Sequence, residues 1–286
     1  MTQNRFFKKA VKNALIIYRN ELSNIIQIVK QAEHWFEKQK IRTYSFSQSS
    51  LSKGSFLDTD IDLVLVLGGD GTYLQAVQHI SNYSVPFLGI NMGSLGFLTV
   101  HKQDSLVSCL KSVIQGKMIS EERSLIDVSV YQEDNQENKY LALNDMVIER
   151  GTFSHLIDIS ITIQNENIYS VKADGVIISS PTGSTAYNLA AGGPILHPQV
   201  NSFAITPICS HSLTNRPVIV PDTYEMLFKI NNNNQSAFLT IDGKKQAQIS
   251  NKHSVKMRKS TMKHLTLRQT NHNDFLLLKD KLKFSQ

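Results

Sequence analysis

Residues 63–72, Leu-Val-Leu-Val-Leu-Gly-Gly-Asp-Gly-Thr, join an unbroken apolar run to a loop of three glycines, a carboxylate and a hydroxyl. The run has the length and the Val and Leu content of a strand that is buried on both faces, as in a parallel sheet covered by helices. Open α/β sheets bind their ligands beyond the carboxyl ends of the strands. We therefore expect this loop to form a binding site.

The residues of the loop indicate which ligand it binds. Gly68, Gly69 and Gly71 have no Cβ, so backbone N–H groups can approach a ligand closely. A helical pattern follows, and a loop that leads into a helix N-terminus suits a phosphate. Asp70 would repel a phosphate unless it holds a metal ion or takes a proton from a hydroxyl that attacks the phosphorus. The alternative is an ordinary strand followed by an Asp-Gly turn.

The composition is that of a globular protein with room for two domains, since the chain has 286 residues, of which 41% are hydrophobic and 19% charged. The net charge of +6 comes largely from basic residues near both ends, without the aromatic-basic interleaving of nucleic-acid binding. Cys109 and Cys209 lie far apart, and the N-terminus lacks the pattern of a secretory signal. We expect a cytoplasmic protein that binds neither nucleic acid nor membrane.

The order of the expected elements changes partway along the chain. Up to about residue 98, strands at 14–18, 62–67 and 87–90 alternate with helices at 21–39 and 73–80, which predicts βαβ units. From about residue 127, short strands follow one another between Asn, Gly and Asp turns, which is typical of an antiparallel sandwich. We expect these strands at 127–131, 140–149, 156–164, 167–172, 175–179, 204–208, 218–220, 225–230, 237–241 and 254–258.

This change predicts an α/β + all-β protein of two domains. A Rossmann-like parallel α/β domain would comprise residues 1–98 plus 270–286, and a C-terminal antiparallel β-sandwich domain would comprise residues 99–269. A helix at 104–115 would link them. The last helix, at 274–284, would return to the N-terminal domain.

Two further groups of residues have the character of binding sites. The segment 91–98, Asn-Met-Gly-Ser-Leu-Gly-Phe-Leu, follows the third strand and would face the same crevice as the first loop, with Phe97 packing either on a flat ring or in the core. Asn144 and Asp145 lie side by side in an apolar strand, where burial is costly unless they bind something. Ribose hydroxyls are suitable partners, and a bulge or strand end with solvated side chains is the alternative.

The segment 172–187 is dense in small hydroxyl residues and includes Thr-Gly-Ser-Thr-Ala-Tyr at its end. Ser184 lacks the flanks of a Gly-x-Ser-x-Gly elbow, and no His and acid partners are marked, so a hydrolase is weakly supported. Thr185 and Tyr187 suit hydrogen bonding and stacking with a base and its sugar.

Taken in order, these motifs resemble those of the NAD kinase family. They are Gly-Gly-Asp-Gly-Thr at 68–72, Asn-Asp at 144–145 and Thr-Gly-Ser-Thr-Ala-Tyr at 182–187. The first is shared with diacylglycerol, sphingosine and phosphofructo-kinases, and the others select the dinucleotide. The resemblance implies transfer of the γ-phosphate of ATP to the 2′-hydroxyl of the adenosine ribose of NAD, giving NADP. Asp70 would be the general base, and Mg²⁺ or another divalent metal the cofactor.

The resemblance also implies nucleotide-binding roles for Gly68, Gly69, Gly71, Thr72, Phe97, Asn144, Asp145, Lys172, Asp174, Thr182, Thr185, Ala186, Tyr187 and Asn188. Phe97 would lie near the adenine, and Asp174 would approach the nicotinamide end. His155 falls where other members often carry a basic residue. Lys244 stands where a glutamine is frequent, and Gln246 is an equally available amide. Family members are homo-oligomers, dimers or tetramers, in which a neighbouring subunit completes the dinucleotide site.

Two other functions stay open. A lipid or other small-alcohol kinase of the same superfamily would need an apolar pocket, whereas Asn144, Asp145, Asp174, Thr185 and Tyr187 form a polar set. A non-catalytic dinucleotide sensor would gain nothing from Asp70, because an extra negative charge does not help to bind phosphate.

Overall fold

The computed structural model describes residues 5–21, 24–51, 60–80, 84–132, 137–151, 156–212, 214–233 and 235–283. The chain forms two compact units: unit 1 comprises Met1–Glu122 with Lys263–Gln286, and unit 2 comprises Arg123–Met262. Two long strands, β7 (Ile119–Gln132) and β18 (His253–Arg268), contribute residues to both units. Among the described residues, no helix has the length and apolar character needed to cross a membrane.

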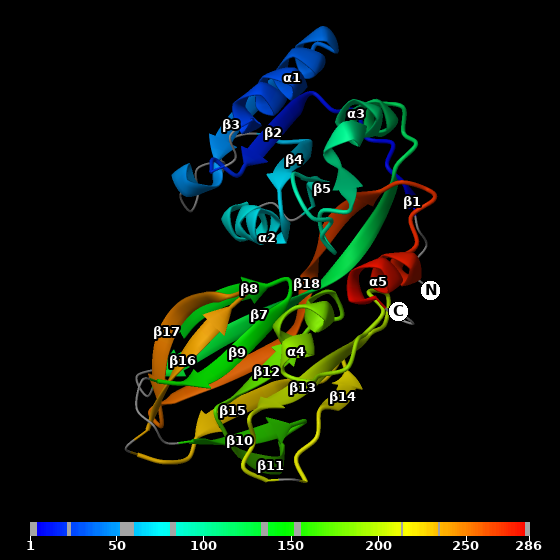
Figure 1. Ribbon diagram of the computed structural model, residues 1–286. Helices are drawn as coiled ribbons and strands as arrows, with labels where there is room; N and C mark the ends of the chain where they lie inside the picture. Colours follow the sequence, from blue (N-terminus) through cyan, green and yellow to red (C-terminus); the bar gives the residue numbers. More distant parts are fainter. Residues whose placement is uncertain are drawn as a thin grey trace. The chain divides into compact units, whose positions relative to one another are not determined.

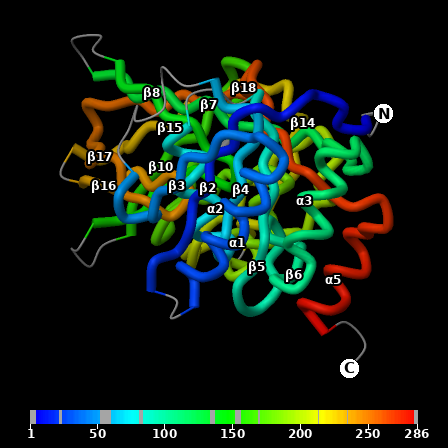
Figure 2. The backbone as a smooth tube through the Cα atoms, turned by 90° about the horizontal axis from the view of Figure 1, so that it is seen from above, coloured from blue at the N-terminus to red at the C-terminus, as the bar shows by residue number. Residues whose placement is uncertain are grey.

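A parallel sheet forms the centre of unit 1 (Figures 1 and 2). Its strands run in the order β3 (Arg42–Ser47), β2 (Asn13–Tyr18), β4 (Leu63–Gly68) and β5 (Pro86–Asn91), and the end of β18 lies parallel beside β5. Short strands β1 (Arg5–Phe6) and β6 (His101–Lys102) pair with β7 and β5. Every residue of β4 is buried, as expected for a strand between two layers of helices.

Helices cover both faces of this sheet. α1 (Ile25–Lys38) and α3 (Leu106–Ile114) share a hydrophobic cluster with Leu65 and Leu67 of β4. Val64 and Val66 alternate with these leucines, and α2 (Asp70–His79) packs against β4 and β2 (Figure 1). Single turns of 3-10 helix, η1 (Gln48–Ser50) and η2 (Gln103–Ser105), follow β3 and β6. α5 (Asp274–Leu282) belongs to unit 1, which confirms the predicted return of the last helix.

The boundary between the units differs from the expected one at residues 98 and 269. Residues 99–122 belong to unit 1, because Leu106, Cys109, Leu110 and Val113 of α3 are part of its hydrophobic cluster. The predicted linking helix is therefore a core helix of the first unit. The end of β18 also belongs to unit 1, because Leu265 and Thr266 pair with β5.

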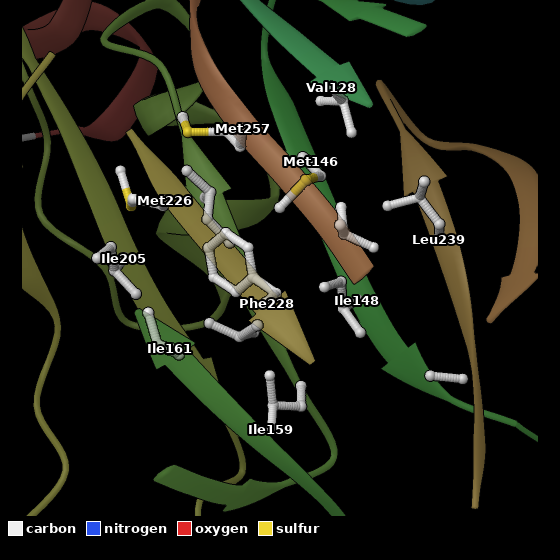
Figure 3. Close-up of a cluster of buried hydrophobic side chains, with 14 of the residues drawn as sticks. Val128, Met146, Ile148, Ile159, Ile161, Ile205, Met226, Phe228, Leu239 and Met257 are labelled. Atoms are coloured by element: carbon white, nitrogen blue, oxygen red, sulfur yellow. The ribbon is translucent and has the colours of Figure 1, made fainter. Parts of the chain in front are cut away.

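Unit 2 is an antiparallel sandwich, as the sequence predicts. One sheet has the order β14 (Val218–Pro221), β13 (Ser202–Ile208), β12 (Gly175–Ser179), β9 (Asp145–Arg150), β16 (Ser236–Ile241) and β17 (Lys244–Ser250). The other contains β11 (Glu166–Ala173), β10 (Ile157–Ile163), β15 (Met226–Ile230), β18, β7 and β8 (Glu137–Ala142). Side chains of both sheets, among them Met146, Phe228 and Leu239, meet in one buried core (Figure 3).

Several expected elements differ in their limits. The single strand expected at 140–149 is two strands, because β8 pairs with β7 and β9 joins the other sheet, with a break at residues 143 and 144. α2 begins at Asp70 and not at residue 73, and β18 continues ten residues beyond the expected end at 258. β3 and β17 were not expected, since Arg-Thr-Tyr-Ser-Phe-Ser and Lys-Lys-Gln-Ala-Gln-Ile-Ser lack an apolar run. Both are edge strands, which tolerate such polarity.

Candidate active site

The glycine loop lies at the carboxyl edge of the parallel sheet, between β4 and α2. Gly68 ends β4 in register with Asn91 at the end of β5, so the loops that follow these strands are neighbours. Gly69 is the N-cap of α2, and Asp70 is its first helical residue. A Cβ at Gly69 or Gly71 would meet no described atom within 4 Å. These two glycines thus leave open space at a helix N-terminus, where an anion is favoured.

Gly68 and Thr72 serve the internal packing of the loop. A Cβ on Gly68 would stand 2.7 Å from the Thr72 Cβ, which is closer than two carbon atoms can pack. Thr72 is buried, and its hydroxyl donates a hydrogen bond to the Gln48 side-chain oxygen at 2.6 Å. The loop is therefore fixed to the turn that follows β3.

Asp70 is held by the backbone of the loop that follows β5. Its Oδ2 accepts a hydrogen bond from the Phe97 N–H at 2.8 Å. Its Oδ1 accepts from the N–H groups of Leu98 and Thr99 at 3.1 and 2.9 Å, and from the Thr99 hydroxyl at 2.9 Å. A Cβ at Gly96 would stand 2.0 Å from Asp70 Oδ1, so only glycine permits this approach.

The same loop is braced from its other side. The guanidinium of Arg268, which is buried, donates to the carbonyl oxygens of Phe97 at 3.0 Å and Leu98 at 3.4 Å. The amide of Asn91 donates to the Thr99 hydroxyl oxygen at 2.9 Å. Two peptide groups thus lie between a cation that binds their carbonyls and an anion that binds their N–H groups.

In unit 2, Asn144 and Asp145 lie where the chain passes from β8 to β9. The Asp242 carboxylate accepts hydrogen bonds from the backbone N–H groups of Leu143, Asn144 and Asp145 at 2.9, 2.7 and 3.1 Å. Asp242 and Gly243 form the tight turn between β16 and β17, and both have positive φ, of 46° and 77°. Such a turn favours this residue pair, so the local sequence places the Asp242 carboxylate under the backbone of 143–145.

The hydroxyl-rich segment locks onto the same backbone. The Ser180 N–H donates to the Asn144 carbonyl at 2.8 Å, and its hydroxyl donates to the Leu143 carbonyl at 2.6 Å. A Cβ at Gly183 would stand 2.2 Å from the Asn144 carbonyl oxygen. Residues Thr182–Thr185 form the 3-10 turn η3, which leads into α4 (Tyr187–Ala190). The two sequence motifs therefore form one packed structure.

The side chains of Asn144 and Asp145 are buried, with exposed fractions of 7% and 4%. The Asn144 Oδ1 has no hydrogen-bond partner among the described residues. Burial, and to a lesser extent the nearby Asp242 charge, raises the pKa of Asp145 to about 7. The buried amide oxygen of Asn144 and the buried carboxyl oxygens of Asp145 are suited to accept hydrogen bonds from the hydroxyls of a ligand.

Tyr187 lies beside several acidic residues on the outer face of the six-stranded sheet. Asp145 and Glu149 alternate along β9 with the core residues Met146 and Ile148, so they point to that face. Burial raises the pKa of the Tyr187 hydroxyl, and the charges of Glu149, Cys209, Asp145 and Asp174 raise it further. Asp174 makes an ion pair with Arg150 at 3.0 Å. Tyr187 is still 43% exposed and can contact a ligand.

Comparison with known proteins assigns both units. The pattern of the "ATP-NAD kinase N-terminal domain" matches residues 5–118, and that of the "ATP-NAD kinase C-terminal domain" matches residues 143–269. The chain belongs to the NAD kinase family. An NAD kinase of Bdellovibrio bacteriovorus is 41% identical over 276 residues, 94% of this chain and 91% of its own. An NAD kinase of Koribacter versatilis is 36% identical over 273 residues, covering 93% and 95%.

Solved structures of NAD kinases share the fold. The yeast NADH kinase, complexed with NADH, superposes with a TM-score of 0.84 at 23% identity, over 98% of this chain and 89% of that one. The NAD kinase of Archaeoglobus fulgidus, in complex with ATP, gives a TM-score of 0.76 at 22% identity, over 93% and 98%. The predicted fold of a parallel α/β unit and a β-sandwich unit is thereby confirmed.

The structure of this NAD kinase family member divides the predicted site residues between its two units. Unit 1 holds the glycine loop, Asp70, Thr72 and Phe97. Unit 2 brings Asn144, Asp145, Asp174 and the segment 182–188 together on and beside one face of a sheet. Lys172 on β11 and Lys244 at the start of β17 are exposed. His155 lies outside the described residues.

Some predicted ligands also have internal contacts. The Asn188 side chain donates to the carbonyls of Ser184 and Pro194 and accepts from the Thr206 hydroxyl, so its amide fixes α4 to the sheet. Ser184 is fully buried and bonds to Pro181 and Leu196, which leaves it unsuited to act as a nucleophile.

Four residues have structural parts in the site that the sequence did not reveal: Asn91, which begins the segment noted at 91–98, and Thr99, Asp242 and Arg268. The Asp-Gly pair at 242–243 is a sequence signal for a tight turn. The sequence does not show that the Asp242 carboxylate binds the backbone of residues 143–145. Asn91 directly follows an apolar strand, which is a signal of the same kind as Gly68. Thr99 and Arg268 carry no local signal, because their partners are peptide groups or residues far away in the sequence.

Proposed function

We propose that this protein transfers the γ-phosphate of ATP to the 2′-hydroxyl of the adenosine ribose of NAD, which yields NADP and ADP. The observation that carries the proposal is the position of Asp70: a single carboxylate, fixed by four hydrogen bonds, in a glycine loop at the N-terminus of α2. An anion site with a fixed carboxylate suits a reaction in which a hydroxyl attacks a phosphate.

Asp70 acts as the general base. It takes the proton of the 2′-hydroxyl while the ribose oxygen forms a bond to the γ-phosphorus, and the bond from that phosphorus to the β-phosphate oxygen breaks, releasing ADP. A positioned base of this kind contributes roughly 10²–10⁴-fold in rate. The open space at Gly69 and Gly71 lets backbone N–H groups approach the phosphates, which supplies further charge stabilisation.

Unit 2 selects the dinucleotide. Asn144 and Asp145 accept hydrogen bonds from ribose hydroxyls, and this use explains why the amide oxygen of Asn144 is buried without a partner among the described residues. Tyr187, with Thr182, Thr185 and Ala186 beside it, contacts the adenosine, and Phe97 lies near the adenine. Asp174 approaches the nicotinamide end, and Lys172 contributes to binding of the same dinucleotide. His155, Asn188 and Lys244 have supporting roles at the same site.

Mg²⁺ enters with ATP in this proposal. Among the described residues, no group of three or more His, Cys, Asp or Glu could hold a metal ion. Mg²⁺ is usually held mainly by substrate phosphates together with one or two carboxylates. The ion would neutralise phosphate charge. We also propose a homo-oligomer, a dimer or tetramer, in which a neighbouring subunit completes the dinucleotide site.

The decisive experiment incubates purified protein with ATP, Mg²⁺ and NAD and follows NADP, beside Asp70→Asn and the surface control Asp280→Asn. We expect NADP formation in the wild type and in the control. In Asp70→Asn the rate should fall by roughly 10²-fold or more while NAD binding, measured by calorimetry, persists. Folded wild-type protein that forms no NADP would overturn the proposal, and full activity of Asp70→Asn would overturn the assigned base.

Two alternatives can be separated in the same assay. A lipid or small-alcohol kinase would phosphorylate diacylglycerol or sphingosine in place of NAD. The polar character of Asn144, Asp145 and Asp174 disfavours an apolar chain. A non-catalytic dinucleotide sensor would bind NAD without product formation, and the fixed carboxylate of Asp70 would then have no use.

A further inference from the structure

The two oxygens of the Asp70 carboxylate are used unequally. Oδ1 accepts three hydrogen bonds, from the Leu98 N–H, the Thr99 N–H and the Thr99 hydroxyl. Oδ2 accepts one, from the Phe97 N–H. A carboxylate offers about two acceptor positions on each oxygen. Oδ1 is therefore saturated, and Oδ2 keeps one lone pair for another proton.

The Thr99 hydroxyl has a fixed direction. The Asn91 amide donates to the Thr99 oxygen at 2.9 Å, so that oxygen acts as an acceptor toward Asn91. Its single proton is then committed to Asp70 Oδ1. The orientation of the Asn91 amide is fixed in turn, because its oxygen accepts from the Gly93 N–H at 2.7 Å. The hydrogen bonds thus run in one direction, from Asn91 through Thr99 to Asp70.

This network is shielded from water. Asn91 and Thr99 have exposed fractions of 4% and 0%, so neither can exchange its partner for solvent at low cost. The Asp70 carboxylate cannot rotate out of this position without losing its four hydrogen-bond donors together. Its orientation is therefore set within the protein, by the N–H groups of Phe97, Leu98 and Thr99 and by the Thr99 hydroxyl.

We propose that Thr99, oriented by Asn91, is a positioning residue that saturates one Asp70 oxygen and leaves Oδ2 as the atom that takes the proton of the acceptor hydroxyl. The proposal rests on the function proposed above for Asp70. It assigns the proton transfer to one oxygen and adds two residues, Asn91 and Thr99, to the machinery of the reaction.

The test compares Thr99→Val, which removes the hydroxyl at nearly constant shape, with Thr99→Ser, which keeps it. The matched control is Thr266→Val, since Thr266 is a fully buried threonine of the same unit whose hydroxyl has no hydrogen-bond partner among the described residues. Steady-state kcat, the KM for NAD and the melting temperature are measured for each protein. If Thr99→Val does not fold, Thr99→Ala replaces it, because it removes the hydroxyl without placing a methyl group against the carboxylate.

We expect kcat of Thr99→Val to fall roughly 10- to 100-fold, with the KM for NAD unchanged within about twofold, because misplaced catalytic groups slow the chemical step. Thr99→Ser should retain kcat within about threefold of the wild type, and Thr266→Val should match the wild type. Wild-type kcat in the folded Val or Ala variant would overturn the proposal. Equal loss of kcat in Thr99→Ser and Thr99→Val would also overturn it, since the methyl group would then matter and not the hydroxyl.

Asp70→Asn, run beside these variants, separates the two proposals. An inactive Asp70→Asn with a fully active Thr99→Val means that only the positioning role is wrong. An active Asp70→Asn means that the base itself is wrong, whatever the behaviour of Thr99.

Discussion

Asp242 and Asp145 are joined by two hydrogen bonds, one to the Asp242 side chain and one between their main chains. The carboxylate of Asp242 accepts from the Asp145 N–H at 3.1 Å, and the Asp145 carbonyl accepts from the Asp242 N–H at 3.0 Å. The reciprocal pair closes β9 onto the turn between β16 and β17. It also places two acidic residues close together, so the charge of Asp242 raises the pKa of the Asp145 side chain.

The stability of the protein should depend on pH through Asp145. Burial first, and the Asp242 charge second, raise the pKa of Asp145 from 3.8 to about 7. Between these values the folded protein keeps a proton that the unfolded chain releases. The contribution of Asp145 to the free energy of unfolding therefore falls as the pH rises from about 4 to about 7, and levels off above that.

Asp145→Asn should remove this decline. The melting temperature of the variant, measured relative to the wild type by calorimetry in one buffer series, should increase between pH 5 and pH 8. A difference between the two proteins that stays constant across this range would contradict the raised pKa.

Asp242→Asn should destabilise unit 2 and weaken dinucleotide binding. An amide has one acceptor oxygen in place of two and loses the charge, while three N–H groups need a partner. We expect a loss of about 2–4 kcal/mol in the free energy of unfolding, measured in urea. Asp158→Asn is the control. The Asp158 carboxylate accepts a hydrogen bond from the Asn231 side chain, and that bond is exposed to solvent. A loss no larger than that of the control would contradict the bracing role.

Gly68→Ala and Gly71→Ala should separate packing from ligand approach. The new methyl group at residue 68 clashes with Thr72, so we expect a loss of about 1–3 kcal/mol in stability. At residue 71 it meets no described atom and lies in a helix, where alanine is favoured over glycine by up to about 1 kcal/mol. Gly71→Ala should therefore fold well but lose roughly tenfold or more in kcat/KM. Wild-type kcat/KM in this variant would show that no ligand passes close to Gly71.

Gly183→Ala should uncouple the Thr-Gly-Ser-Thr segment from Asn144. The Cβ would overlap the Asn144 carbonyl oxygen, so one of the two segments must move. We expect an unfolding free energy lower by about 2 kcal/mol and a large rise in the Kd for NAD. Gly151→Ala, also in unit 2, places its Cβ 3.7 Å or more from its neighbours and should be tolerated. If the two variants bind NAD equally well, the two motifs are independent of each other.

Much of the fold could be predicted from periodicity. The apolar run at 63–67 and the spacing of Ile25, Ile28 and Val29 indicate a buried strand and a core-facing helix, and both are confirmed. The edge strands β3 and β17 escaped prediction because polar edge strands have no pattern that distinguishes them from loops. The limits of the two units could not be predicted, because α3 belongs to unit 1 through the residues it packs against, and local sequence does not reveal these partners.

The candidate site could be predicted where polar side chains or glycines interrupt or directly follow an apolar strand within one short segment. Gly68, Asp70, Asn144 and Asp145 stand out for this reason. Arg268 binds the Phe97 carbonyl, although the two residues lie 171 positions apart in the sequence. Neither segment has a sequence pattern that predicts this contact. Thr99 is one threonine among many until Asn91 and Asp70 are seen on either side of it.

The way in which Asp70 is held has a consequence for sequence variation in this loop. Three of its four donors are main-chain N–H groups, which nineteen of the twenty amino acids supply equally. These hydrogen bonds therefore do not depend on which side chains stand at 97 and 98, although Leu98 is buried and packing limits its size. Proline alone is barred from 97, 98 and 99, since it has no N–H to donate.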